Sequence, residues 1–519
     1  MKKILTLVLC VCAALALAGT AGAAVSFGVT EDAAIGAPDG GLAFFAALND
    51  IGLTENHVVV SWDPSAPLTI PNQPNLDAWV QQAALHGIRI VFSVVPAHPT
   101  DLTSSAAAPA QFAAFLRVLA QAYPTVRDFV VGNEPNQPRF WQPQFGAGGT
   151  GVSGGAYEKV LALGYDALKS VDPSINVIGV GLSPRGNDDP KAPDNISISP
   201  VRFLHDLGVA YRASGRTKPL MDEFAFHPYP NQNNDPPGLG YPWPKAGFPN
   251  LDRIKQAIWD AFNGTPQPVF AERGNAGGAH PLKLDLDETG WQVVIPPAYK
   301  ALYYGTESAG LKLIDEQTQA QYYGDIVRLV SCDPNVRSLS FFHLMDERNL
   351  DRWQSGLERA DGSHRPSYDA VKSAIAQTHG TCALPPIGWM HMTTVSGAAV
   401  KFGWLAPRRA RATNWGFAAA VQEDATYRAG VFRIPGRRLP SKKRAALARA
   451  LANASVRPAV GAHGTAKAYL SQTVKFPRKR VRAGWYVYAI RFAAAMNPSR
   501  ASVFVSRPFH VVGRAKRRK

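Results

Sequence analysis

From residue 25 onward, short apolar runs alternate with longer segments whose apolar positions recur every three or four residues. A run such as IRIVFSVVP (88–96) predicts a strand buried on both faces, and PAQFAAFLRVLAQAY (109–123) predicts an amphipathic helix. Eight such strand–helix units follow one another within about 355 residues. The expected strands are 25–32, 57–62, 88–96, 126–136, 175–184, 221–230, 282–292 and 336–346.

This alternation predicts an α/β fold, a (β/α)8 TIM barrel of eight parallel strands with a helix after each one. An open doubly wound sheet is the alternative, but it usually has fewer strands, and no glycine-rich phosphate loop follows the first strand here. Long connections follow strands four, six and seven, at 137–155, 231–250 and 293–315. In a barrel all three lie on the catalytic face, where their aromatic residues either line a cleft or pack the loops onto the barrel.

After residue 383 the pattern changes to strand-like runs at 401–406, 427–435, 484–493 and 501–512, with a helix-like insertion at 441–454. These runs favour a small all-β sandwich, immunoglobulin-like in the loose sense. The predicted organisation is a signal peptide at 1–23, a barrel at 24–383, a basic sandwich-like accessory domain at 384–512 and a basic tail at 513–519.

The first residues combine Lys2 and Lys3, an apolar run and a small-residue Ala-Gly-Ala site, which is typical of a secretory signal peptide. The alternative is an anchoring helix, for which the apolar run is short. We therefore expect a secreted, extracellular protein, with association to a cell wall as a further option. The mature chain keeps Cys332 and Cys382, predicted as one disulfide on the bottom face of the barrel; two buried free thiols are the other interpretation.

Charge divides the chain into two parts. Residues 380–519 hold 27 Lys and Arg but 2 Asp and Glu, a net charge of +25, whereas the whole chain carries +16, so residues 1–379 carry −9. This asymmetry suggests different partners for the two domains. For the basic domain we consider an anionic cell-wall or polysaccharide surface, contacted through KFPRKRVR (475–482), a passive spacer, and nucleic acid, which export disfavours.

Two strands end in a carboxylate. VRDFVVGNEPN (126–136) presents Glu134, and LKLDLDETGWQ (282–292) presents Glu288. Because strands four and seven face each other across a barrel mouth, these two side chains can approach one another. Paired carboxyl groups cleave glycosidic bonds with retention when about 5–5.5 Å apart and with inversion when about 6.5–9.5 Å apart.

The motifs GNEPN after strand four, HPY after strand six and DETGW after strand seven, taken together, resemble the clan of retaining (β/α)8 glycoside hydrolases with catalytic glutamates on strands four and seven. The cellulase-like family 5 and the family 39-like enzymes are the most similar members. The resemblance covers about residues 25–379 and implies a polysaccharide or oligosaccharide substrate, without a cofactor. It does not specify the sugar.

The resemblance implies a role for each matching residue. Glu134 is the expected general acid/base and Glu288 the expected nucleophile. Asn133 is expected to bind the sugar 2-hydroxyl, His227 to lie near the acid/base, and Tyr229 to hydrogen-bond Glu288. Further substrate-binding candidates are the aromatic residues Trp141, Trp291 and Trp353.

Some features depart from family 5. HVVVSWDP at strand two lacks the arginine that usually supports the nucleophile, and strand eight ends in FFHLMDE, which offers His343, Asp346 and Glu347 instead of a tryptophan. Strand alternation predicts that Asp287 points away from the site. No metal-binding spacing is evident, so no metal is expected.

The expected function is a secreted retaining glycoside hydrolase that works through a glycosyl-enzyme intermediate. The alternatives are a transglycosidase, which would use the same residues, and a non-catalytic carbohydrate- or wall-binding protein built on the same barrel.

Overall fold

The computed structural model describes residues 24–275, 280–383, 388–403, 408–409, 416–452, 457–477 and 481–512. The chain divides into two compact units. The second consists of residues 241–246, 252–261 and those from 390 onward, and the first of the remainder. The predicted signal peptide (1–23), the basic tail (513–519) and residues 478–480 of the KFPRKRVR segment lie outside the described residues.

Eight parallel strands close into a barrel in sequence order, and β8 pairs back onto β1 with Ser338 opposite Ser26. This confirms the predicted (β/α)8 topology. The strands are β1 Ser26–Thr30, β2 Glu55–Trp62, β3 Arg89–Pro96, β4 Asp128–Val131, β5 Asn176–Leu182, β6 Glu223–Phe226, β7 Lys283–Thr289 and β8 Val336–Phe341.

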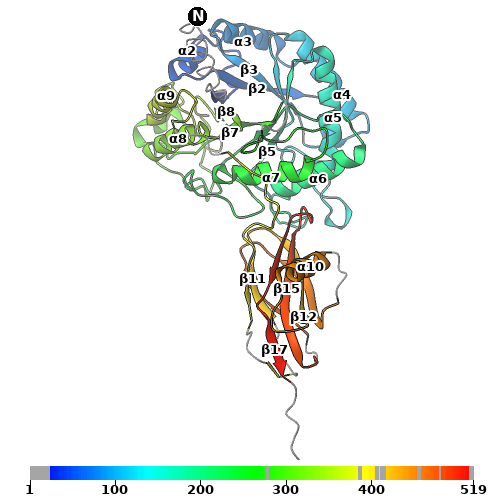
Figure 1. Ribbon diagram of the computed structural model, residues 1–519. Helices are drawn as coiled ribbons and strands as arrows, with labels where there is room; N and C mark the ends of the chain where they lie inside the picture. Colours follow the sequence, from blue (N-terminus) through cyan, green and yellow to red (C-terminus); the bar gives the residue numbers. More distant parts are fainter. Residues whose placement is uncertain are drawn as a thin grey trace, which may run out of the picture. The chain divides into compact units, whose positions relative to one another are not determined.

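A helix follows each strand in the sequence, and the helices of the first unit surround the barrel on its outside (Figure 1). They are α2 Leu42–Ile51, α3 Gln73–Leu85, α4 Ala108–Ala122, α5 Ser153–Val171, α6 Pro200–Ser214, α7 Leu251–Phe262, α8 Glu316–Val330 and α9 Pro366–Thr378. Short 3-10 helices lie at Asp101–Thr103, Ala147–Gly149, Phe248–Asn250 and Pro297–Leu302.

The local sequence explains these boundaries, as α8 illustrates. Asp315 caps the helix, because its side chain accepts a hydrogen bond from the backbone N–H of Thr318 at 2.7 Å. Tyr323, Val327 and Val330 repeat at helical spacing and are buried against the barrel. The same spacing on the other helices makes their positions predictable from sequence.

The interior of the barrel is polar towards the amino-terminal ends of its strands. Arg337 on β8 forms ion pairs with Glu223, with Asp285 at 3.0 Å and with Glu55 at 3.4 Å, and Arg89 also pairs with Glu55. Buried charges need partners of this kind, because the interior does not solvate them. Their burial raises the pKa of Asp285 to about 7 and the pKa of Glu223 well above its usual range.

A disulfide joins Cys332, which follows α8, to Cys382, which follows α9. Both positions lie at the end of the barrel opposite the carboxyl ends of the strands, as the sequence predicts. No helix among the described residues is both long and apolar enough to cross a membrane.

The C-terminal part of the second unit forms two sheets that enclose a common apolar core, which includes Phe417 and Val474 from one sheet and Val431 and Tyr488 from the other. One sheet has the order β10-β17-β15-β12-β13, with β16 beside β15, and the other has the order β14-β11-β9. The elements are β9 Ala399–Phe402, β10 Arg408–Arg409, β11 Gly416–Ala420, β12 Ala425–Ile434, α10 Ser441–Ala452, β13 Val460–Ala466, β14 Gln472–Lys475, β15 Gly484–Ala494, β16 Ala501–Val505 and β17 Phe509–Val512.

The predicted sandwich is therefore confirmed, with three differences in its strands. The run 501–512 is not one strand but two, because Pro508 precedes β17 and cannot donate a ladder hydrogen bond. The sequence pattern does not predict β11 and β13, whose alanine- and glycine-rich sequences carry a weak strand signal, nor the short strands β10 and β14. The pair β10–β17 is parallel in an otherwise antiparallel unit.

Candidate active site

The segment after β4 bends sharply and fixes Glu134. Gly132 has a φ of 89° and Glu134 a φ of 38°, so both residues adopt the left-handed region, which is unfavourable for a glutamate. The backbone N–H of Glu134 donates to the carbonyl of Gly181 on β5 at 2.7 Å. Asn136 secures the same turn, because its side-chain amide donates to the carbonyls of Ser183, Arg185 and Ile198 at 3.0–3.1 Å. A strained carboxylate-bearing turn held in this way is typical of a functional position.

His227, directly after β6, lies at the centre of the site and is fully buried. Its Nδ1 is 3.0 Å from Glu134 Oε1 and 3.5 Å from Glu288 Oε2. Its backbone N–H donates to the carbonyl of Leu182 at 3.0 Å, which fixes the ring between the ends of β5 and β7. Burial lowers the pKa of His227, but the surrounding carboxylates of Glu288, Asp287 and Glu134 outweigh it and raise this pKa well above the usual value. The imidazole is therefore a cation at neutral pH.

Glu288, near the end of β7, faces Glu134 across this imidazolium. Tyr229 Oη donates to Glu288 Oε2 at 3.2 Å. Burial raises the pKa of Glu288 to about 7; the charge of Glu134 adds to this rise, while His227 and the hydrogen bond from Tyr229 oppose it. Carboxylates from strands four and seven, the histidine and the tyrosine thus meet at one end of the barrel, although 154 sequence positions separate the two glutamates.

Asp287 does not point away from this group, so the expectation from strand alternation is wrong. Its Oδ1 lies 3.3 Å from Nε2 of His227, and the side chain is buried. The physical reason is the register shift between Leu286 and Thr289 in the pairing of β7 with β8, which breaks the strict alternation of side chains. The site therefore has a third carboxylate, for which the sequence carried no signal.

Gly181 is a second contributor that sequence reasoning missed. It has a φ of 61°, and a Cβ atom at this position would lie 3.3 Å from Nε2 of His227 and 3.5 Å from the side-chain oxygen of Asn133. A larger residue would therefore press on the histidine. Asn133 itself is half-buried, and its side chain makes no hydrogen bond within the described parts of the chain, so its amide is available to a ligand.

The three tryptophans proposed as sugar contacts have different environments. Trp353 is half-buried, and its ring centroid lies 5.1 Å from that of Tyr229, so it borders the site. Trp291 is 1% exposed; its indole N–H donates to the carbonyl of Asp235 at 2.9 Å, and its ring stacks on Phe248. Trp141 is 2% exposed and packs against Tyr157. The structure therefore corrects the expectation for Trp141 and Trp291, because rings this deeply buried pack loops rather than offer a face to a sugar.

The polar residues after β8 also hold the loop together. His343 Nδ1 lies 2.8 Å from the carbonyl of Thr30, and Glu347 accepts from the backbone N–H of Trp353 at 2.9 Å. Asp346 pairs with the buried Arg365 and accepts from Tyr303 at 2.6 Å. Among the described residues, His227 is the basic side chain that contacts both Glu134 and Glu288.

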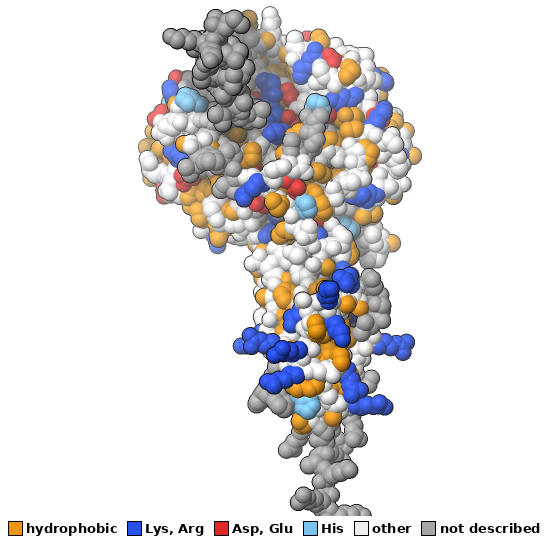
Figure 2. Space-filling model, in the orientation of Figure 1, with side chains coloured by type: hydrophobic (Ala, Val, Ile, Leu, Met, Phe, Trp, Pro, Cys, Tyr) orange, Lys and Arg blue, Asp and Glu red, His pale blue; other side chains and the backbone are white. Residues whose placement is uncertain are grey.

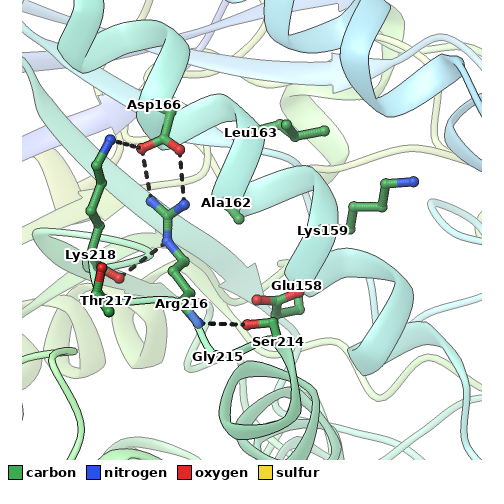
Figure 3. Close-up of a pocket in the computed structure, with 10 residues that line it drawn as sticks. All are labelled: Glu158, Lys159, Ala162, Leu163, Asp166, Ser214, Gly215, Arg216, Thr217 and Lys218. Atoms are coloured by element: carbon green, nitrogen blue, oxygen red, sulfur yellow. Dashed lines mark hydrogen bonds and ion pairs between the residues drawn. The ribbon is translucent and has the colours of Figure 1, made fainter.

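No group of three or more His, Cys, Asp or Glu among the described residues is arranged to hold a metal ion. A cavity of about 410 Å³ lies between α5 and the segment after α6 (Figure 3). There Asp166 is bound by Arg216 through two contacts of 2.9 Å and 3.0 Å and by Lys218 at 3.3 Å. The segment after α6 leads into the amino-terminal end of β6, whereas Glu134 and Glu288 lie at the carboxyl ends of the strands, so this hollow is not part of the site.

No protein-family model matches the chain, and no curated protein matches it. Solved structures with a similar fold include a family 39 glycoside hydrolase from Bacteroides cellulosilyticus, at 15% identity and a TM-score of 0.45 over 78% of this chain and 75% of the other. A family 39 β-xylosidase from Caulobacter crescentus matches at 15% identity and a TM-score of 0.42 over 89% of this chain and 95% of the other. An exo-β-1,4-mannosidase from an Opitutaceae bacterium matches at 12% identity and a TM-score of 0.41, over 70% of this chain and 62% of the other.

Proposed function

We propose that the barrel is a retaining glycoside hydrolase, with Glu288 as the nucleophile and Glu134 as the general acid/base. The observation that carries this proposal is the contact of both carboxylates with one nitrogen of His227. Since Glu134 Oε1 and Glu288 Oε2 lie 3.0 Å and 3.5 Å from that atom, their separation cannot exceed the sum of the two distances, about 6.5 Å. This limit includes the spacing of about 5–5.5 Å needed for retention and leaves little room for the water that inversion requires.

The reaction proceeds by double displacement. A carboxylate oxygen of Glu288 attacks the anomeric carbon while the bond to the leaving oxygen breaks, and Glu134 gives its proton to that oxygen. In the second step Glu134 takes a proton from water, which attacks the same carbon and releases Glu288. Asn133 is available to hydrogen-bond the sugar beside the reacting carbon, and Trp353 to pack against a sugar ring.

The surroundings of Glu288 act on its pKa in opposite directions. Burial and the charges of Glu134 and Asp287 raise this pKa to about 7. The charge of His227 and the hydrogen bond from Tyr229 oppose the rise, and so favour the ionised form that a nucleophile needs.

We also propose that the enzyme is exported. The disulfide between Cys332 and Cys382 supports this proposal, because such bonds persist in oxidising compartments. The lysines and the apolar run at the start of the sequence support it independently.

The test uses the mature protein with aryl β-glycosides and a polysaccharide panel, and NMR of the first-formed anomer. We expect a β-configured product, and losses of several orders of magnitude in kcat for Glu288→Ala and Glu134→Ala. Azide should restore turnover in both variants with opposite stereochemistry: an α-glycosyl azide from Glu288→Ala and a β-glycosyl azide from Glu134→Ala.

Glu307→Ala is the matched control, because Glu307 is an exposed glutamate in the loop after β7. It should keep wild-type activity. An α-configured first product, or near-normal turnover in either active-site variant, would contradict the assignment.

A further inference from the structure

The C-terminal sheets carry an unusual excess of positive charge (Figure 2). Residues 390–519 contain 27 Lys and Arg but only two acidic side chains, Glu423 and Asp424. Glu423 is bound by Arg500, and Asp424 by Lys467 at 2.6 Å. No acidic side chain in this part of the sequence is left to pair with the other cations, so their charge is available to an external anion.

Some of these cations surround a cavity of about 430 Å³ beside α10. Its floor includes Phe432, Ile434 and Leu447, and its lining carries the cationic side chains of Arg433, Lys443 and Arg457. We call this cavity the α10 pocket. It joins an apolar surface to three positive charges.

The sequence of β12 explains why the pocket is apolar inside and basic at its edge. Val431 faces the core between the two sheets, whereas Phe432 and Ile434 belong to a separate cluster with Val487 and Leu451. This second cluster lies on the outer face of the larger sheet, where α10 covers it. The helix is short of apolar residues, because SKKRAALARALA carries four Lys and Arg, and it leaves part of that face open.

We propose that the α10 pocket binds an acidic polysaccharide whose sugar units carry carboxylates, that is, a polyuronate. Sugar rings present apolar C–H faces, which the floor can cover, while their carboxylates meet Arg433, Lys443 and Arg457. A polyol phosphate chain has negative charge but no flat apolar face, so contact with the apolar floor of the pocket would add little to its binding. The pocket thereby holds the protein on an anionic polymer.

This inference extends the proposed function by naming what the second unit binds, but it does not depend on catalysis. Binding is therefore measured with the full mature chain carrying Glu288→Ala, which excludes hydrolysis. The probe is polygalacturonate, in affinity gel electrophoresis and in sedimentation. Neutral hydroxyethyl cellulose and inorganic polyphosphate are run in parallel.

The charge-reversal pair Lys443→Glu/Arg457→Glu should weaken polygalacturonate binding at least tenfold. The matched control is Lys401→Glu/Lys475→Glu, which changes the net charge equally but lies on β9 and β14 of the smaller sheet. The control should lose less than threefold. Because Lys475 begins the KFPRKRVR segment, the control also tests whether that segment is the contact surface.

Leu447→Gln keeps all charges and should still weaken binding severalfold, because it places an amide on the apolar floor. Thermal melting shows whether each variant remains folded, and Lys443→Gln/Arg457→Gln replaces the reversal pair if it does not. Equal losses of binding in the two charge-reversal pairs, or unchanged binding by Leu447→Gln, would show that the α10 pocket is not the binding site. Tighter binding to polyphosphate than to polygalacturonate would overturn the choice of a polyuronate.

Discussion

At the scale of residues, the site is a problem of charge balance around one imidazole. Glu134, Glu288 and Asp287 all lie within 3.5 Å of the ring nitrogens of His227. Water screens charges in this largely buried group weakly, so the charges of Glu134 and Asp287 raise the pKa of Glu288, while the charge of His227 lowers it. Asp287 touches only the nitrogen that faces away from the two glutamates, and we therefore regard it as a positioning residue.

Asp287→Asn should shift the acidic side of the pH profile. With the pKa of Glu288 at about 7, kcat/KM of the wild type should fall as the pH drops through this value. The charge of Asp287 raises the pKa of Glu288, so removing it should lower that pKa and move the acidic limb to lower pH. The measurement is kcat/KM on an aryl glycoside between about pH 4 and about pH 8, a range that extends to both sides of the pKa of Glu288.

Asp285→Asn is the control, because Asp285 is also a buried acid on β7 but contacts Arg337 and Ser338 instead of His227. It should lower stability and move the acidic limb less. An acidic limb that stays in place in Asp287→Asn would show that Asp287 has no influence on the site.

At the scale of elements, each strand of the barrel has two different ends. The carboxyl ends of β4, β6 and β7 carry the site, whereas the amino-terminal half of the interior is held by the ion pairs of Arg337 and Arg89. A network that surrounds one arginine with three carboxylates is weakly stabilising as a whole, but breaking it is costly, since charges are left buried without partners.

Arg337→Met should therefore lower the free energy of unfolding by about 3–5 kcal/mol. The loss should be greater at pH 8 than at pH 5. Glu223 and Asp285 would lose their ion pair with Arg337, whereas Glu55 keeps Arg89, and protonation of Glu223 and Asp285 at low pH relieves the cost. Denaturant unfolding at the two pH values measures it.

Arg337→Lys keeps the charge and should recover part of the loss, although lysine cannot contact several carboxylates through a planar fork. A loss that is the same at both pH values would point to a packing defect rather than to unpaired charges.

At the scale of the whole molecule, the chain combines an acidic barrel with a basic sandwich, and the disulfide belongs to the barrel alone. Cys332 and Cys382 are 50 positions apart, and the loop they close contains β8 and α9. The bond thus ties the last strand–helix unit into the closed barrel, where fraying would open the sheet between β8 and β1.

Cys332→Ser/Cys382→Ser should lower barrel stability by about 2–4 kcal/mol and leave kcat at moderate temperature unchanged. The bond lies at the opposite end of the barrel from the site, so its loss should affect unfolding rather than geometry at Glu134 and Glu288. Denaturant unfolding followed by tryptophan fluorescence measures the loss. Reducing agent should destabilise the wild type to the same extent and leave the double variant unaffected; equal stability of both proteins would contradict the prediction.

The sequence by itself determined the order and type of the elements of the barrel, and the end of the barrel at which the chemistry lies. A near-continuous apolar strand and an amphipathic helix repeat eight times. This alternation is a property of neighbouring residues, so it can be recognised without knowing which distant segments are in contact. The positions of Glu134, His227, Tyr229 and Glu288 at strand ends followed from the same repeat, since parallel strands bring their carboxyl ends to one face. Their meeting in the structure is a consequence of barrel closure.

Only the tertiary structure decided which side chains reach each other. The register shift in β7 turned Asp287 towards His227, and loop packing buried Trp141 and Trp291 while leaving Trp353 at the edge of the site. The α10 pocket likewise arises because a lysine- and arginine-rich helix covers part of a sheet face. Register, ring burial and cavities depend on contacts between distant segments, and a sequence pattern that describes each segment alone does not contain them.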